Sequence, residues 1–214
     1  MTVRLLSSAQ RHDIVSVFCD AFHDYPVMRC VLGPVAPYAE RLRTLVGLFV
    51  SGRVLRNDPL LGIYDEGGSL VAAATMTLPG DPSPPPAMIA HREAVWGELG
   101  RAARARYEAF TTATQQFAIS APHHHLNMIG VRGSHQGRGL SRTLLESAHA
   151  LAAADPRSTG VSLSTELSRN LSLYEHFGYR VYGHAHVTDA LETWTLFRPV
   201  DYLSAELHQH GVME

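Results

Sequence analysis

The stretch that decides the fold is residues 128–140, with the sequence MIGVRGSHQGRGL. An apolar strand is expected to run into a turn with three glycines and then into an amphipathic helix. Glycine lets the backbone turn tightly and approach a ligand without a Cβ in the way. The first turn of a helix carries unpaired N–H groups and partial positive charge. The stretch therefore predicts a cradle for a phosphate or pyrophosphate, to which Arg138 and Arg142 can add charge.

Two other glycine-rich motifs do not fit this turn. A phosphate-binding P-loop ends in Gly-Lys-Ser or Gly-Lys-Thr, whereas Gly139 is followed by Leu140 and Ser141. A dinucleotide fingerprint has a third glycine where this sequence has Arg142. On spacing alone, a tight turn without a ligand remains an alternative.

The remaining sequence predicts a mixed sheet with helices on its faces. In the first half, apolar spacing predicts a strand at 3–6, a helix from Ser7 or Ser8 to Phe22 that ends at 24–26, a helix after residue 37, strands at 60–64 and 70–78, a loop at 80–86, and helical segments over 88–120 broken near 97–100. In the second half, it predicts strands at 124–132, 160–166, 179–187 and 191–197, and helices at 138–153 and 169–177. We expect one domain at 1–200 and a tail at 201–214.

The composition excludes several classes of protein. The net charge is −2 over 214 residues, so no global basic field favours nucleic acid or anionic lipid. Two cysteines, Cys19 and Cys30, do not make a disulfide framework. No run approaches the roughly 20 apolar residues that a membrane span needs. We expect a cytoplasmic protein with no nucleic-acid or membrane partner.

The turn resembles the acetyl-CoA motif of the GNAT superfamily, Q/R-x-x-G-x-G/A after a strand. The matching residues are Gln136, Gly137, Arg138, Gly139, Leu140 and Ser141, with serine where the family has glycine or alanine. The resemblance implies a mostly antiparallel sheet of six to seven strands that splays at the cofactor site. It also implies that the amides of the turn hold the CoA pyrophosphate and that Ile129, Gly130 and Val131 line the pantetheine arm.

A second match follows about 30 residues later, where 170–179 resembles the N-x-x-x-Y-E-x-x-G-F/Y segment of the same family. By this resemblance, Asn170 contacts the cofactor arm and Tyr174 lies near the thioester sulfur. Amine attack expels a thiolate, which a phenol can protonate. We therefore expect Tyr174 to be the general acid.

Several stretches further resemble the puromycin N-acetyltransferase branch, namely residues 21–26, 130–140, 169–179 and 193–195. That branch often carries a glutamate at the position of Ser164. Here Glu166 stands two residues later, on the same strand face if the strand continues that far. This departure puts puromycin itself in doubt as a substrate.

The sequence leaves the general base open between His125, Glu166 and loss of a proton through water. Within the run 123–125, His123 and His125 share a strand face while His124 points away. Two ligands without a nearby cysteine do not complete a zinc site, so we expect no metal.

Two segments are candidates for the acceptor walls. Asp24 can attract an ammonium group and Tyr25 can stack on an aromatic substrate, although both also fit a simple helix end. The aromatic residues of the insert 81–120 are spaced like a helix core face, and a second acceptor wall is the alternative.

The leading hypothesis is direct transfer of an acetyl group from acetyl-CoA to a primary amine of a small molecule. The alternatives are an enzyme of the same fold acting on a protein or peptide amine, and a non-catalytic acyl-CoA-binding module. A closed apolar pocket favours the first and an open acidic groove the second. A homodimer through C-terminal edge strands is left open.

Overall fold

The computed structural model describes residues 2–80 and 83–200, so the tail predicted at 201–214 lies outside the described residues. In chain order the elements are β1 Arg4–Leu5, α1 Arg11–Ala21, α2 Pro26–Leu32, α3 Tyr38–Leu55, β2 Leu60–Tyr64, β3 Leu70–Thr77, α4 Pro86–Leu99, α5 Arg101–Gln115, β4 His124–Val131, α6 Leu140–Ala154, β5 Gly160–Thr165, α7 Leu171–His176, β6 Arg180–Thr188 and β7 Leu191–Pro199. Short 3-10 turns at Ser8–Gln10, Gly133–His135 and Ser168–Asn170 precede α1, α6 and α7.

In the described part of the chain, seven strands form one sheet in the order β1-β2-β3-β4-β5-β7-β6. β4 and β5 run parallel, and all other neighbouring strands are antiparallel. The predicted mostly antiparallel sheet of six to seven strands is therefore confirmed.

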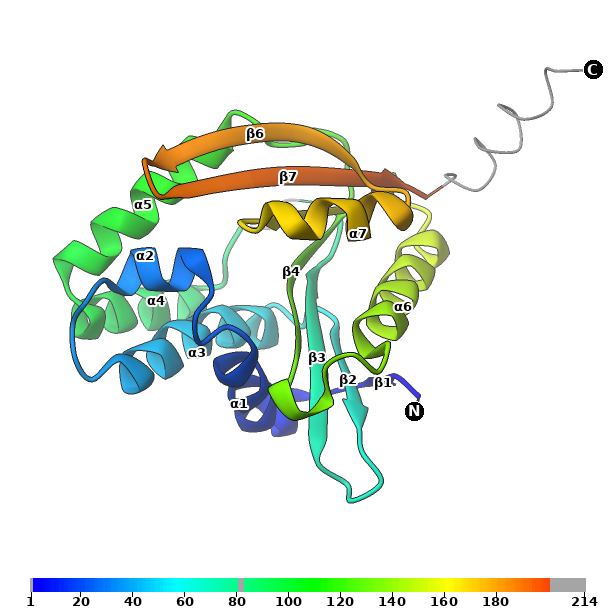
Figure 1. Cartoon of the computed structure of the whole chain (residues 1–214), viewed down its shortest axis with the longest axis horizontal. Helices are drawn as coiled ribbons and strands as arrows, with labels where there is room; N and C mark the ends of the chain where they lie inside the picture. Colours follow the sequence, from blue (N-terminus) through cyan, green and yellow to red (C-terminus); the bar gives the residue numbers. More distant parts are fainter. Residues whose placement is uncertain (1, 81–82, 201–214) are drawn as a thin grey trace, which may run out of the picture.

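Helices cover both faces of this sheet, each over its own apolar core (Figure 1). The helices α1 to α5 enclose one core, in which Phe18, Leu45 and Trp96 are buried. α6 and α7 lie on the other face, where Leu144 and Tyr179 are buried. The strand β4 passes between α1 and α6, so its two faces contact both cores.

The prediction that residues 24–26 only end a helix is incomplete, because Pro26 also begins α2. Proline suits the first position of a helix, where its missing N–H would have no partner and its fixed φ is already helical. Met28, Val31 and Leu32 then bury the inner face of this short helix. As a result, Tyr25 is held between two helices rather than in a long loop.

Among residues 2–80 and 83–200, the structure contains no helix that is long and apolar enough to cross a membrane.

Candidate active site

A gap opens in the sheet between β4 and β5. The two strands pair at only three positions of β4, from His124 to Leu126. Beyond Leu126, β4 continues to Val131 beside β3 alone, and β5 continues to Thr165 beside β7 alone. Within the described residues, the edge of β4 that faces this gap thus has no strand partner. Such an edge offers backbone N–H and C=O groups to an extended ligand.

A bulge in β4 coincides with the start of the gap. Met76 of β3 pairs with Leu126 and Thr75 pairs with Met128, which leaves Asn127 as the extra residue. A bulge bends its strand and increases its twist, and here it lies where β4 separates from β5. The side chain of Asn127 accepts a hydrogen bond from Thr77 Oγ1 at 3.0 Å.

The glycine-rich turn lies at the end of β4. Gly137 and Gly139 both have φ of +75°, a left-handed conformation that side chains disfavour. Because Gly139 cannot continue a helix in this conformation, α6 begins at Leu140 rather than at the predicted Arg138. The residues Gln136 to Gly139 are exposed, as an anion-binding turn requires. The free amides at the start of the fifteen-residue helix α6 are suited to a pyrophosphate.

Side chains from distant segments fix this turn to the rest of the fold. The Arg132 guanidinium donates to the Leu70 carbonyl at 3.0 Å and to Ser16 Oγ at 3.1 Å. The Gly133 amide donates to Asp20 Oδ2 at 3.0 Å. The turn is therefore held against β3 and α1 before any ligand binds.

The three residues expected along the pantetheine arm have different surroundings. Ile129 lines the cavity described below, and Val131 packs against the core under α6. Gly130 faces α1, since an added Cβ would come within 2.9 Å of the Ala21 Cβ. Its missing side chain thus lets α1 pack closely on β4.

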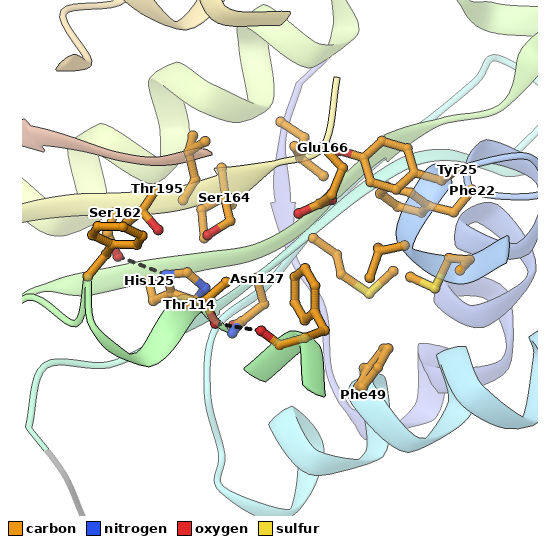
Figure 2. Close-up of a pocket in the computed structure, with 18 of the residues that line it drawn as sticks. Phe22, Tyr25, Phe49, Thr114, His125, Asn127, Ser162, Ser164, Glu166 and Thr195 are labelled. Carbon is orange, nitrogen blue, oxygen red and sulfur yellow. Dashed lines mark hydrogen bonds between the residues drawn. The ribbon is translucent and has the colours of Figure 1, made fainter. Parts of the chain in front are cut away.

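A cavity of about 600 Å³ lies beside the gap. Figure 2 shows residues that line it. Its apolar wall combines α1 to α3 with the insert, through Phe22, Tyr25, Val27, Met28, Val31, Leu45, Phe49, Tyr107, Phe110 and Phe117. Polar groups come mainly from β4, β5 and the residues after β5, through His123, His125, Asn127, Ser162, Ser164, Glu166, Asn170, Tyr174 and Thr195.

Glu166 lies one residue beyond β5 and still lines the cavity. Its Oε1 accepts a hydrogen bond from Thr193 Oγ1 at 2.8 Å. Burial raises the pKa of the Glu166 carboxyl to about 7, although hydrogen bonds from Thr193 and Tyr25 oppose this shift. A carboxyl with this pKa is suited to exchange protons near neutral pH.

Tyr174, on α7, is buried and lines the same cavity. Its ring packs edge-on against Tyr179, with ring centroids 5.8 Å apart. Burial, together with the negative charge of Glu166, raises the pKa of the Tyr174 hydroxyl to about 12. Tyr174 therefore keeps its proton throughout the neutral range.

His125 also faces the cavity, and its Nδ1 lies 2.8 Å from Ser162 Oγ. In Figure 2 this pair lies at one end of the cavity, whereas Glu166 lies beside Tyr25 at the other. Burial lowers the pKa of the His125 imidazole to about 4, which makes it a weak base at neutral pH. The preceding His124 points to the opposite face, where it is buried against Ser158, as strand alternation predicts.

The predicted acceptor residues Asp24 and Tyr25 lie in different surroundings. Asp24 is 79% exposed, pairs with Arg29 and is absent from the cavity lining. Tyr25 lines the cavity, and its hydroxyl accepts a hydrogen bond from the Glu166 amide at 3.2 Å and lies 3.2 Å from Thr165 Oγ1. Tyr25 thus fixes the segment that carries Glu166.

The same threonine connects this network to Asn170. The Asn170 side-chain amide donates to Thr165 Oγ1 at 3.1 Å. Asn170 and Tyr25 therefore share one partner, although they are expected to serve the cofactor and acceptor sides respectively.

The aromatic residues of the insert divide between core and cavity. Trp96 of α4 is buried in the core, as helix spacing favours. Tyr107 and Phe110 of α5, and Phe117 just after it, line the cavity instead. The insert thus lines one side of the cavity, and its role as an acceptor wall stays a prediction.

Sequence reasoning missed Thr193 and Ser162, which contact the two candidate bases. Both are small hydroxyl residues on strands. Their partners depend on the register between strands and on contacts between segments that are distant in the sequence. Only the family resemblance of 193–195 pointed to part of this set.

Comparison with known proteins agrees with the fold described above. Residues 92–181 match the model of a family described as acetyltransferase (GNAT) domain. No curated protein matches the chain.

Several solved acetyltransferases share the fold. The structure of histone acetyltransferase HPA2 and related acetyltransferase from Corynebacterium glutamicum has a TM-score of 0.71 at 20% identity, over 92% of this chain and 95% of that one. Mosquito arylalkylamine N-acetyltransferase like 5b has a TM-score of 0.59 at 12% identity, over 92% and 99%. Naa20 from Chaetomium thermophilum, in complex with a bisubstrate analogue, has a TM-score of 0.53 at 15% identity, over 97% and 91%. Residues 92–181 therefore match a GNAT acetyltransferase domain, within a chain that has the fold of these acetyltransferases.

Proposed function

We propose that this protein transfers an acetyl group from acetyl-CoA to a primary amine on a small molecule with an apolar, aromatic body. One observation carries the proposal: Glu166 and Tyr174 both face an aromatic cavity beside the unpaired edge of β4. A base, an acid and a binding edge thus meet at one place.

The residues that would hold acetyl-CoA fit its chemistry. The exposed amides of the turn and the Arg138 cation suit the pyrophosphate. The free edge of β4 at Ile129 and Val131, together with Asn170 in the lining of the same cavity, suits the amide groups of the pantetheine arm. When bound, acetyl-CoA supplies an acetyl thioester at the gap.

Glu166 accepts a proton from the ammonium group of the acceptor, which becomes a neutral amine. Tyr174 donates its hydroxyl proton to sulfur as the nitrogen–carbon bond forms and the carbon–sulfur bond breaks. The proton that nitrogen loses on becoming an amide restores Tyr174 through water. His125, with its pKa lowered to about 4, is the weaker candidate for the base and instead orients Ser162.

The cavity supports a small acceptor over a protein. Aromatic and aliphatic side chains together form its apolar wall, and among its lining residues the one carboxylate is Glu166. Arg53 also lines the cavity, and its charge is paired with Asp58. A single carboxylate beside several aromatic rings suits one ammonium group on an aromatic body, since rings also attract cations. The names of the similar structures include both histone and arylalkylamine acetyltransferases, so they do not choose between these classes.

The test is thiol release from acetyl-CoA across arylalkylamines, aminonucleosides, polyamines, amino acids and short peptides. We expect kcat/KM to be at least about ten-fold higher for an arylalkyl or aromatic aminonucleoside substrate than for polyamines and peptides. Fastest turnover on peptides would replace this proposal with the protein acetyltransferase. Binding of acetyl-CoA without any turnover would favour the non-catalytic module.

A matched pair of variants on α3 tests the cavity itself. Phe49 lines the cavity, whereas Leu55 is exposed at the end of the same helix. Phe49→Ala is expected to raise the KM of the amine about ten-fold or more while the KM of acetyl-CoA stays unchanged. Leu55→Ala should change neither constant. An unchanged amine KM in Phe49→Ala would place the acceptor elsewhere.

A further inference from the structure

Two histidines and a glutamate meet at the edge of the sheet, on the β6–β7 hairpin. His184 and His186 stand two residues apart on the edge strand β6, so both side chains lie on one face. Glu192 of β7 pairs with His186 across the two strands. None of the three lines the cavity of the candidate active site.

The polar atoms of the three side chains lie close enough together to be metal ligands. His184 Nε2 lies 3.0 Å from Glu192 Oε2, and His186 Nδ1 lies 3.6 Å from Glu192 Oε1. One ligand atom from each residue can be chosen so that all three lie within 4.8 Å of one another. Zinc bonds of about 2.0–2.1 Å in a tetrahedral site separate the ligand atoms by roughly 3.3 Å. Small side-chain rotations therefore suffice to bring the three atoms around one ion.

The surroundings of the group favour a defined geometry with an open position. The His184 ring stacks on Trp194, with centroids 4.7 Å apart and planes 3° from parallel, which fixes the imidazole. The side chains of His184, His186 and Glu192 are 37%, 70% and 42% exposed, so an ion can reach them from solvent. Three protein ligands leave a fourth tetrahedral position for water.

We propose that His184, His186 and Glu192 bind a divalent transition-metal ion of the zinc type. Imidazole nitrogen and carboxylate oxygen suit zinc, and the same donors exclude calcium and magnesium, which take oxygen ligands. The ion links the edge strand β6 to β7. Thr193 of β7 donates a hydrogen bond to Glu166. The site stabilises this hairpin and takes no part in the proposed acetyl transfer.

The test measures Zn²⁺ binding by calorimetry and Co²⁺ coordination by its visible absorption, with untagged protein freed of metal by a chelator. The starting protein carries His208→Ala and His210→Ala, because a further His-x-His pair stands at those positions of the sequence. We expect one Zn²⁺ per chain and an absorption band typical of tetrahedral Co²⁺. His186→Ala and Glu192→Gln should each weaken binding about ten-fold or more, and both replace exposed groups.

His12→Ala is the matched control, because His12 is an exposed histidine on α1, outside this group. It should leave the affinity and the stoichiometry unchanged. Equal weakening in all three variants, or unchanged binding in His186→Ala and Glu192→Gln, would overturn the site. So would the lack of any stoichiometric binding by the starting protein. Thiol release, followed in parallel, should be the same in every variant, which separates this proposal from that of the acetyl transfer.

Discussion

Glu166 is the residue whose protonation decides the rate in the proposed mechanism. Its pKa is raised to about 7, so its basic form grows as the pH rises through neutrality. At saturating amine, we expect kcat to rise about ten-fold per pH unit below pH 7 and to level off above it. Tyr174, with a pKa of about 12, should cause no fall in kcat at high pH within the measurable pH range.

Glu166→Gln should flatten this profile and lower kcat by about 100-fold or more, because general-base catalysis contributes that much. The measurement is kcat against pH for both proteins with one amine. A profile that keeps its rise in the variant would assign the titration to another group, or to water-mediated loss from the amine itself.

Tyr174 is expected to act through its hydroxyl alone. Tyr174→Phe keeps the ring that packs on Tyr179 but removes the proton donor. We expect kcat to fall about 100-fold with little change in the KM of acetyl-CoA or in thermal stability. Tyr182→Phe is the matched control, because Tyr182 is 55% exposed on β6. Equal kcat in wild type and Tyr174→Phe would remove the acid role.

At the scale of elements, the turn before α6 depends on two left-handed glycines. Gly139→Ala meets no steric obstacle, because nothing lies within 4 Å of the added Cβ, yet its φ is strained. We expect a loss of about 1–2 kcal/mol in the free energy of unfolding and a raised KM for acetyl-CoA. Urea unfolding and thiol-release kinetics measure the two effects.

Gly97→Ala is the control for this substitution. Gly97 also has open space around its Cβ position, but it lies inside α4. Alanine there should stabilise the protein by up to about 1 kcal/mol and leave both KM values unchanged. A raised KM for acetyl-CoA in Gly97→Ala, or an unchanged one in Gly139→Ala, would argue against the turn as the binding element.

The elements near the turn could be predicted because their signals are local. Glycine spacing, apolar periodicity and the family resemblance together predicted the sheet and the order of its strands along the chain. The helix α2 was missed because Pro26 marks both the end of one helix and the first position of the next. A proline after a short polar stretch does not distinguish these two cases.

The site was only partly predictable, because its contacts join distant segments. The Tyr25 hydroxyl meets Thr165 across 140 positions of sequence, and Thr193 reaches Glu166 from the last strand. The sequence also does not reveal that burial raises the pKa of Glu166 and lowers that of His125. These properties follow from the assembled cavity rather than from any local pattern.

At the scale of the whole molecule, partly buried histidines oppose Glu166 in setting the pH dependence of stability. Burial lowers the pKa values of His125 and His149 to about 4, below the ordinary histidine value of 6.5. Between these pKa values the unfolded chain binds more protons than the folded chain, so stability falls as the pH drops from about 6.5 toward 4. The raised pKa of Glu166 has the opposite effect on stability. The stability that Glu166 contributes is fully present below the ordinary pKa value of 4.5 and is lost as the pH rises through about 7.

Removing Glu166 should therefore expose the histidine effect. By linkage, as the pH falls from about 7.5 to 5, each of these two histidines lowers the free energy of unfolding by roughly 2 kcal/mol. Over the same range Glu166 raises it by roughly 2 kcal/mol. Glu166→Gln should thus lose roughly 2 kcal/mol more unfolding free energy than wild type over this range, as measured by urea titration. Adding His149→Gln, which can keep a hydrogen bond to the Tyr179 hydroxyl, should make the loss roughly 2 kcal/mol smaller than in Glu166→Gln alone. A loss in Glu166→Gln no steeper than in wild type would mean that Glu166 does not carry the raised pKa on which the proposed base depends.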